Sequence, residues 1–331
     1  METKDILIIG GGISGLLCAK KMQAAGKTVA VLDKGRGVGG RMSTRWGMGA
    51  ARMDHGAQFF TVRDPRWQVL VQQMLAAGVV REWFRYAPWD TNPMGYPRYC
   101  GVDGMNAIPK YLAQGIEIHT SQQVINLQRA ESIWIAETQS GERFSGYELV
   151  VTIPLPQARP LLDSSGLNWA NRAARAQMDQ VSYERGLATL VHLEGPSAVP
   201  APGCLKLNTD PLIWIADNHK KGISADPVLT LHSSAEFALR HWNSMDSIRG
   251  RLMVEAAEEW LGGSSVAAFS CHRWGFTTPR HNLKQSIYRN EGLGLTMAGD
   301  AFGGAKVEGA ALSGLDAAEA ILANEMISAV G

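Results

Sequence analysis

The sequence predicts a two-lobe α/β protein, and three observations lead to this prediction. The chain has 331 residues, which is more than one hydrophobic core usually organises. Residues 4–15, KDILIIGGGISG, predict a buried strand, a glycine-rich turn and the start of a helix. Residues 293–300, LGLTMAGD, predict a second buried strand that ends in glycine and an acid. We expect both segments in one lobe with a parallel sheet.

The first segment carries the spacing of a dinucleotide-binding turn. Ile6 to Ile9 is a short, unbroken apolar run, as expected of a strand buried on both faces. Gly10, Gly12 and Gly15 follow with the spacing G-x-G-x-x-G, which allows a tight turn, a close approach of pyrophosphate and close helix packing. The N–H groups at the start of the helix would bind the phosphates. The same glycines could also form a purely structural turn.

An acid at the end of the second strand supports the binding hypothesis. Residues 28–32 predict a strand that ends in Asp33, where a carboxylate can accept hydrogen bonds from an adenosine ribose. The alternative is that Asp33 only caps the next turn. Because strand, glycines, helix, strand and acid occur in this order, we infer a Rossmann-like dinucleotide-binding unit.

The composition excludes several other classes of function. The chain is 45% hydrophobic and 19% charged with a net charge of +1, so we expect no nucleic acid or membrane partner. The four cysteines are far apart and the histidines lack a metal-ligand spacing, so we expect no metal and no disulfide. Only a few residues precede the first strand, and no apolar run could span a bilayer, so we expect a cytoplasmic protein.

Residues 34–45, KGRGVGGRMSTR, predict a second phosphate-contacting loop that begins at Lys34. The segment resembles the glycine- and arginine-rich loop of flavoproteins similar to glutathione reductase and the amine oxidases. The resemblance implies that Gly39 and Gly40 let the backbone approach the cofactor closely and that Arg41 lies beside the pyrophosphate. The alternative is a solvated basic loop.

The next motif is DHGAQFF at residues 54–60, and the same resemblance implies that its backbone from Gly56 to Phe60 borders the flavin ring. Adjacent residues of an extended segment point to opposite sides, so Asp54 and His55 are not expected to act as an acid/base pair. The same resemblance places Ala57, Gln58 and Phe59 nearest the ring.

The middle of the chain predicts a helix, a loop and several strands. Residues 64–78 show helical periodicity, and the aromatic loop 86–101 offers Tyr96, Arg98 and Tyr99 either as a substrate-stacking group or as surface residues. Apolar runs predict strands at residues 116–120, 124–129, 133–138, 147–153, 187–193 and 229–233, and helices at 234–243 and 244–261. In two-lobe flavoproteins the adenine lies against the strand that here contains Val124.

The division into lobes follows from this order. We expect residues 1–60, 101–155 and 273–331 to form the cofactor domain, and residues 61–100 and 156–272 to form a substrate domain with a mixed sheet and helices. Within the latter, Arg185, Gly186, Leu187 and Ala188 are further candidate substrate contacts.

The closing segment is predicted to complete the cofactor site. Asp300 ends a strand, and the glycine-rich start of the following helix would direct N–H groups towards the same ligand. A reduced flavin carries negative charge on its pyrimidine side, which these groups would stabilise. The alternative is an ordinary strand–loop–helix crossover.

Five segments together resemble a specific family, the bacterial renalase-like branch of the amine-oxidase-like flavoproteins. They are residues 34–45, 54–60, 101–113, 272–274 (HRW) and 299–314. The resemblance implies noncovalent FAD, with Asp33 on the ribose, Arg41 by the phosphates, Asp300 on the ribitol and Val307 near the isoalloxazine. The expected cofactor-binding residues are Gly10, Gly12, Ile13, Gly15, Asp33, Lys34, Gly40, Arg41, Ala57, Gln58, Phe59, Val124, Asp300 and Val307.

The resemblance also implies a reaction, the oxidation of 2- or 6-dihydro-NAD(P) to NAD(P)⁺ with O₂ reduced to hydrogen peroxide. Hydride transfer from a dihydropyridine to flavin requires no side-chain base, so no catalytic residue is assigned. Amine oxidases tend to use a lysine near the flavin; no lysine lies between Lys221 and Lys284, and the role of Lys306 stays open. The alternatives are an amine or other small-molecule oxidoreductase and a non-catalytic flavin-binding partner protein.

Overall fold

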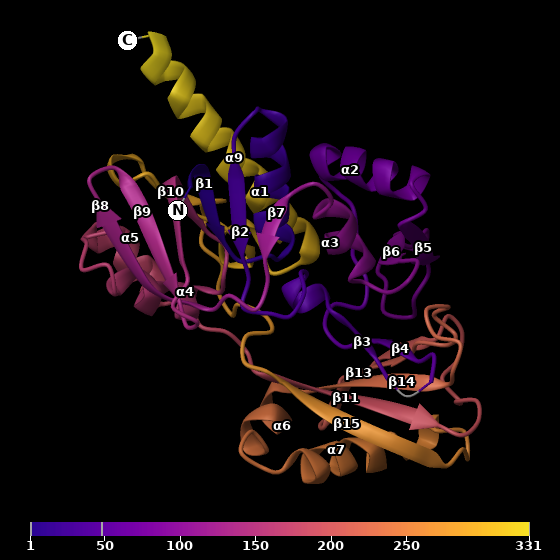
Figure 1. Cartoon of the computed structure of the whole chain (residues 1–331). Helices are drawn as coiled ribbons and strands as arrows, with labels where there is room; N and C mark the ends of the chain where they lie inside the picture. The colour runs from indigo at the N-terminus through magenta and orange to yellow at the C-terminus, as the bar shows by residue number, and fades with distance from the viewer. Residues whose placement is uncertain (1, 48, 331) are drawn as a thin grey trace. The chain divides into compact units, whose positions relative to one another are not determined.

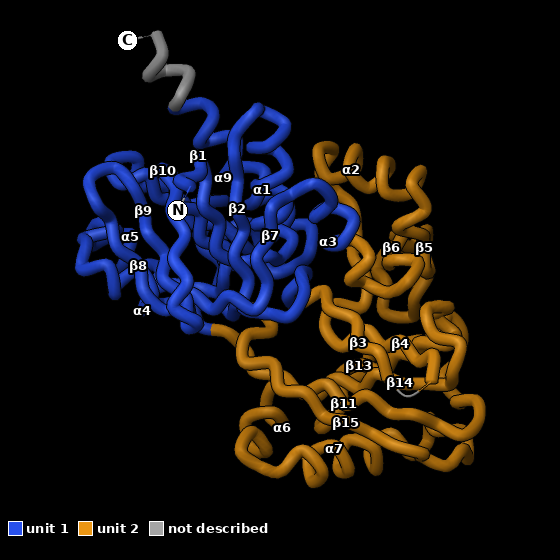
Figure 2. The backbone as a smooth tube through the Cα atoms, viewed as in Figure 1, with its two compact units in different colours: residues 1–40, 109–182, 279–331 blue, residues 41–108, 183–278 orange. Residues whose placement is uncertain are grey.

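The computed structural model describes residues 2–47 and 49–330, which form two compact units (Figures 1 and 2). The first unit comprises residues 1–40, 109–182 and 279–331, and the second comprises residues 41–108 and 183–278. None of the helices in the described residues has the length and hydropathy that a transmembrane segment requires.

A parallel sheet forms the centre of the first unit. Its strand order is β16-β17-β10-β1-β2-β7, and β8 and β9 extend it as an antiparallel meander on β10. All neighbours from β17 to β7 are parallel, and β16 is antiparallel. The bounds are β1 Thr3–Ile9, β2 Val29–Leu32, β7 Glu117–His119, β8 Val124–Ala130, β9 Ile133–Thr138, β10 Arg143–Val151, β16 Tyr288–Asn290 and β17 Leu295–Met297.

Helices pack on this sheet, and α1 from the first part of the chain lies against α9 from the last part. The core between α1 and α9 contains Ile6, Cys18, Ala317 and Ile321, all fully buried. Burial raises the pKa of the Cys18 thiol to about 12, so Cys18 behaves as a small hydrophobic residue. The helices of the unit are α1 Ile13–Ala24, α4 Leu155–Asp163, α5 Arg172–Asp179, α8 Asp300–Gly303 and α9 Val307–Val330, and α3 Ala107–Leu112 begins at the unit boundary.

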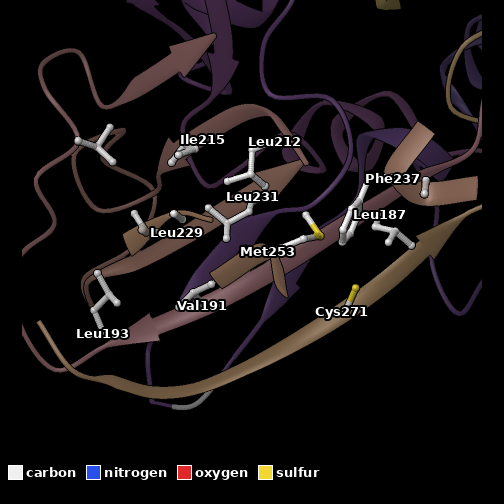
Figure 3. Close-up of a cluster of buried hydrophobic side chains, with 13 residues drawn as sticks. Leu187, Val191, Leu193, Leu212, Ile215, Leu229, Leu231, Phe237, Met253 and Cys271 are labelled. Atoms are coloured by element: carbon white, nitrogen blue, oxygen red, sulfur yellow. The ribbon is translucent and has the colours of Figure 1, made fainter. Parts of the chain in front are cut away.

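The second unit is built around an antiparallel sheet, which has five strands within the described residues. Its order is β12-β13-β14-β11-β15, so β15 is an edge strand. Helices α6 and α7 cover one face, where Leu187, Leu231, Phe237 and Met253 form the core (Figure 3). The strands are β11 Gly186–Leu193, β12 Cys204–Lys206, β13 Leu212–Asp217, β14 Val228–Ser233 and β15 Val266–Trp274, and the helices are α6 Ala235–Arg240 and α7 Asp246–Glu255.

Two hairpins and a helix complete this unit. The hairpins are β3 Thr44–Trp46 with β4 Arg52–Asp54, and β5 Val80–Phe84 with β6 Arg98–Gly101; the helix is α2 Pro65–Ala76. Three 3₁₀ turns in the described chain span η1 Gly40–Met42, η2 Glu258–Trp260 and η3 Glu291–Leu293.

Several element boundaries differ from the predicted ones. The predicted helix at residues 244–261 ends as an α-helix at Glu255 and continues as the 3₁₀ turn η2. The strand expected at residues 147–153 begins earlier, at Arg143, because residues 143–146 pair with β9. The strand expected at residues 293–300 covers only Leu295–Met297, and Asp300 opens α8 instead.

The residue ranges of the two compact units differ from those of the two expected domains. Residues 41–60 and 101–108 pack with the second unit because Asp54 is bonded to Lys221 and the Met105 N–H donates to Asp54. Residues 156–182 pack with the first unit, where the Ser164 hydroxyl accepts a hydrogen bond from the Leu127 N–H of β8.

Candidate functional site

The glycine-rich turn of the first unit has the geometry of a phosphate cradle. Gly10 has φ +114°, and its N–H donates to the Leu32 carbonyl. A Cβ at Gly15 would lie 2.0 Å from the Gly10 carbonyl oxygen, so only glycine allows α1 to pack this closely on β1. A Cβ at Gly12 would instead meet nothing within 4 Å. The turn therefore leaves open space at Gly12, where a pyrophosphate would approach the backbone.

A buried hydroxyl at the start of α1 fits the same ligand. Ser14 is only 4% exposed, and its Oγ has no hydrogen-bond partner within the described chain. Buried polar atoms without a partner are uncommon in folded proteins, and a bound group often satisfies them. Ile13 lies beside Ser14 and is buried, as expected for the first residue of α1. This hydroxyl and the space at Gly12 both suit a phosphate group.

Asp33 joins the two glycine-rich segments. One carboxylate oxygen accepts the Gly11 N–H and the other accepts the Gly35 N–H, each at 2.6 Å. A carboxylate has about four acceptor positions, so two remain for ribose hydroxyls. The Gly39 N–H donates to the Gly11 carbonyl at 2.9 Å, and Gly40 lies against Gly12. The predicted neighbours Gly12, Asp33 and Gly40 are thus brought together, whereas the Lys34 side chain is exposed.

The closing segment reaches the same turn of the first unit. A Cβ at Gly314 of α9 would lie 2.1 Å from the Ser14 carbonyl oxygen, so α9 crosses α1 closely near its start. Asp300 is 7% exposed at the start of α8, and Val307 begins α9. Lys306 is exposed. Val124, the predicted adenine contact, begins β8 and pairs with Thr138.

The segment at residues 54–60 lies within the second unit and is anchored there by a buried ion pair. The Lys221 ammonium donates to Asp54 Oδ2 at 2.7 Å and to the Gln58 carbonyl at 2.6 Å, and both charged side chains are 0% exposed. The other Asp54 oxygen accepts the Thr44 hydroxyl and the Met105 N–H. This pair fixes the backbone that the motif predicts beside the flavin.

The side chains of this segment have different surroundings. The Ala57 N–H donates to the Arg41 carbonyl at 2.8 Å, and a Cβ at Gly56 would lie 2.0 Å from the same oxygen. Gln58 is buried and its Oε1 is without a partner among the described residues. Phe59 packs with Trp83, Phe84 and Trp214.

His55 packs away from Asp54, as expected for adjacent residues of an extended segment. It packs on His272 and Trp274, each at a ring centroid distance of 5.1 Å. Burial and the charges of neighbouring groups lower the pKa of His55 to about 3, and burial lowers the pKa of His232 to about 4. Both imidazoles are therefore neutral and weakly basic at physiological pH.

Two of the predicted substrate contacts are buried within the second unit. Arg98 has a side-chain exposure of 7% and forms an ion pair with Asp90, which lowers the pKa of that carboxyl. Its charge is balanced by Asp90 within the second unit. Leu187 belongs to the core beneath α6 and α7, where it lies near Phe237 (Figure 3).

The remaining predicted substrate residues occupy different positions. Tyr96 is 42% exposed, and Tyr99 stacks on Phe60 at 5.6 Å. The Arg185 guanidinium lies over the Trp242 ring at 4.6 Å. Gly186 pairs with Trp274, and Ala188 pairs with His232 on one side and His272 on the other.

Sequence reasoning did not find the Asp54–Lys221 pair or the Arg98–Asp90 pair. Asp54 and Lys221 are 167 residues apart, and no local pattern relates them. The adjacent polar residues Asp54 and His55 draw attention to this segment, but they do not identify Lys221 as the partner of Asp54. The described residues contain no cluster of three His, Cys, Asp or Glu side chains that could hold a metal ion.

Comparison with known proteins agrees with this architecture. Residues 8–74 match the family model of the NAD(P)-binding Rossmann-like domain, and residues 83–322 match that of the flavin containing amine oxidoreductases. A structure named as a candidate protoporphyrinogen oxidase from Exiguobacterium sp. 255-15 is similar, with 13% identity and a TM-score of 0.74; 97% of this chain and 99% of that chain are covered.

A second similar structure is a triple mutant of putrescine oxidase with redesigned cofactor binding. It is 15% identical, with a TM-score of 0.72, and the alignment covers 97% of this chain and 99% of that chain. At this identity the likeness concerns the fold, and it confirms the predicted two-lobe α/β architecture with a Rossmann-like cofactor domain.

Proposed function

Because the chain belongs to the flavin containing amine oxidoreductases, we propose that it is a renalase-like oxidase of misreduced nicotinamide dinucleotides. Its substrates would be 2- or 6-dihydro-NAD(P), and its products NAD(P)⁺ and hydrogen peroxide. The cofactor is FAD, as the family and the dinucleotide-binding turn indicate. Five motifs of the sequence, including residues 34–45 and 101–113, support the renalase-like branch.

The observation that carries this proposal is that three side chains of the second unit, Lys221, His55 and His232, are poorly suited to act as bases. An amine substrate is oxidised more easily when a base accepts a proton or positions water, whereas a dihydropyridine only has to transfer a hydride. Lys221 is bonded to Asp54 and the Gln58 carbonyl, and the pKa of both His55 and His232 is strongly lowered. These groups around residues 54–59 are poor proton acceptors, and a substrate that donates a hydride does not need one.

The chain's own residues would hold and orient the reactants. When bound, FAD would supply a hydride acceptor, and O₂ would take up the two electrons with two protons as hydrogen peroxide. In the first unit, Gly12 and Ser14 suit the pyrophosphate, and Asp33 suits the ribose. Asp300 is proposed to bind the ribitol, and Val307 is proposed to lie near the isoalloxazine ring. In the second unit, Ala57, Gln58 and Phe59 are proposed beside the ring, and attachment is proposed to be noncovalent.

Oxygen consumption tests the proposed reaction. With 2- or 6-dihydro-NAD(P), we expect one O₂ to be consumed and one hydrogen peroxide formed for each NAD(P)⁺, because two electrons are transferred in each step. Turnover with ordinary 4-dihydro-NAD(P)H should be slow. An amine panel that includes putrescine serves as the comparison, because the family and one similar structure favour amine oxidation as the second candidate function.

The outcomes of this experiment separate the candidate functions. Turnover of an amine with indifference to the isomers would replace the proposal by amine oxidation. A yellow protein that oxidises none of these donors would indicate a non-catalytic flavin-binding partner. The other expected partners are limited to the dinucleotide and O₂, without metal, nucleic acid or membrane.

Replacing Arg41 by alanine is expected to weaken FAD binding by about 1.5–3 kcal/mol, because a charge-assisted phosphate contact would be lost. In the second unit the Arg41 guanidinium donates to the Thr277 carbonyl at 3.2 Å and lies 5.7 Å from the Tyr183 ring centroid. Titration of the apoprotein with FAD measures the effect. Arg251→Ala is the matched control, since that side chain is 66% exposed on α7. Equal affinities of the two variants would show that Arg41 does not bind phosphate.

A further inference from the structure

A pocket at the free edge of the second sheet has a strongly cationic lining. It has a volume of about 590 Å³, and its lining comes from β15, from Arg45 of β3 and from the first turn of α7. Three arginines, Arg45, Arg249 and Arg273, line it together with one carboxylate, Asp246. The formal charge of these four side chains is +2, although the whole chain carries only +1.

The three arginine side chains have different hydrogen-bond and ion-pair partners. Arg249 is 2% exposed and is ion-paired with Asp246, and it also donates to the carbonyls of Trp242 and Ser244. The Asp246 charge is therefore already balanced by a buried partner. Arg45 and Arg273 are exposed and donate to neutral acceptors, the His272 ring nitrogen at 3.3 Å and the Trp242 carbonyl at 3.4 Å. Their two charges are not balanced by these contacts.

The residues that line this pocket carry further donors. Within Arg249, which is 98% buried, the Nε atom has no hydrogen-bond partner in the described chain. Because β15 is an edge strand, alternate backbone N–H groups along it are not paired with β11. The His272 ring accepts from Arg45, and burial together with the Arg45 charge lowers its pKa, so it is held neutral. The pocket thus combines two exposed guanidinium groups with unused N–H donors.

From this lining we propose that the pocket along β15 binds a phosphoryl anion between Arg45 and Arg273. Guanidinium groups and backbone N–H groups are the usual partners of phosphate oxygens in proteins. A diphosphate suits the site best, because two unbalanced arginines and two negative phosphoryl groups match in charge. The inference concerns only contacts within the second unit and does not depend on the proposed substrate.

Two sources could supply this anion. One is the diphosphate of a dinucleotide whose nicotinamide end is being oxidised, which would make the pocket a substrate subsite. The other is a free nucleoside diphosphate or inorganic diphosphate, which would make it a separate effector site. Both share the same phosphoryl chemistry, and competition experiments distinguish them.

Calorimetric titration of the FAD-loaded protein tests the site. Loading with FAD first keeps the probes out of the cofactor site. We expect ADP and inorganic diphosphate to bind and neutral adenosine not to bind, and binding should weaken as salt screens the exposed charges. Arg45→Gln and Arg273→Gln should each weaken ADP binding about tenfold or more, because each removes a charge-assisted contact. Arg251→Gln on the exposed face of α7 is the control and should bind as the parent protein does.

The outcomes decide both the site and its role. If ADP competes with the dinucleotide and thereby slows flavin reduction, the pocket is a substrate subsite. If ADP binds without competing, the pocket is a separate site. The proposal is overturned if adenosine binds as tightly as ADP. It is also overturned if Arg45→Gln and Arg273→Gln both bind ADP as tightly as Arg251→Gln does. For this comparison, the thermal unfolding of each variant must match that of the parent protein.

Discussion

Replacing Lys221 by methionine is expected to destabilise the protein by about 3–5 kcal/mol, because the Asp54 carboxylate would stay buried without its cation. Both side chains are 0% exposed, and Lys221 also donates to the Gln58 carbonyl. Methionine retains most of the apolar volume of lysine, so little of the effect would come from a cavity. Chemical denaturation of the purified apoprotein measures the free energy of unfolding.

A double-mutant cycle identifies the cause. Lys221→Met combined with Asp54→Asn should recover part of the lost stability, because an amide carries no charge that must be buried. Lys284→Met, at an exposed lysine, is the control and should change stability by no more than about 0.5 kcal/mol. A Lys221→Met protein as stable as the control would show that the ion pair contributes nothing beyond its packing.

The second large effect is expected at Gly12 and Gly15, where the glycine-rich turn after β1 leads into α1. Gly15→Ala would place a methyl group 2.0 Å from the Gly10 carbonyl oxygen, so α1 would have to move away from β1. We expect this variant to lose stability by about 1–3 kcal/mol even without cofactor, as overpacked sites do, and to bind FAD poorly. Thermal unfolding of the apoprotein and titration with FAD measure the two effects separately.

Gly12→Ala is the matched variant and should behave differently. Gly12 has φ −79°, which alanine adopts without strain, and its Cβ would meet no atom within 4 Å. The apoprotein should therefore be as stable as the parent. Its FAD affinity should fall about 100-fold or more, because the methyl group occupies the space of the pyrophosphate. Undiminished FAD affinity in Gly12→Ala would show that the pyrophosphate does not bind at this turn.

The sequence predicted those parts of the fold that depend on local patterns. The strand, glycines and acid of residues 6–33 follow one another in the order that a Rossmann-like unit requires, and the structure confirms their placement around Gly12. The parallel strands around β1 were likewise predictable, because their apolar runs are short and end at glycine or an acid.

The remaining features depend on contacts between distant residues. Arg98 looked available for substrate because its loop is aromatic and polar, but Asp90, eight residues earlier, balances its charge. Leu187 was a candidate contact because it follows a turn, but the alternation of β11 directs it to the core with Phe237. The Asp54–Lys221 pair joins two hairpin-like segments whose proximity no periodicity in the sequence encodes.

Anaerobic reduction of the bound flavin tests the proposed function most directly. Mixing the FAD-loaded protein with 2- or 6-dihydro-NAD(P) should bleach the flavin absorbance about 100-fold faster or more than mixing it with 4-dihydro-NAD(P)H or with putrescine, a difference of about 2.7 kcal/mol in activation free energy. Equal rates with the three dihydro isomers, or bleaching by the amine alone, would contradict the assignment as an oxidase of misreduced nicotinamide dinucleotides.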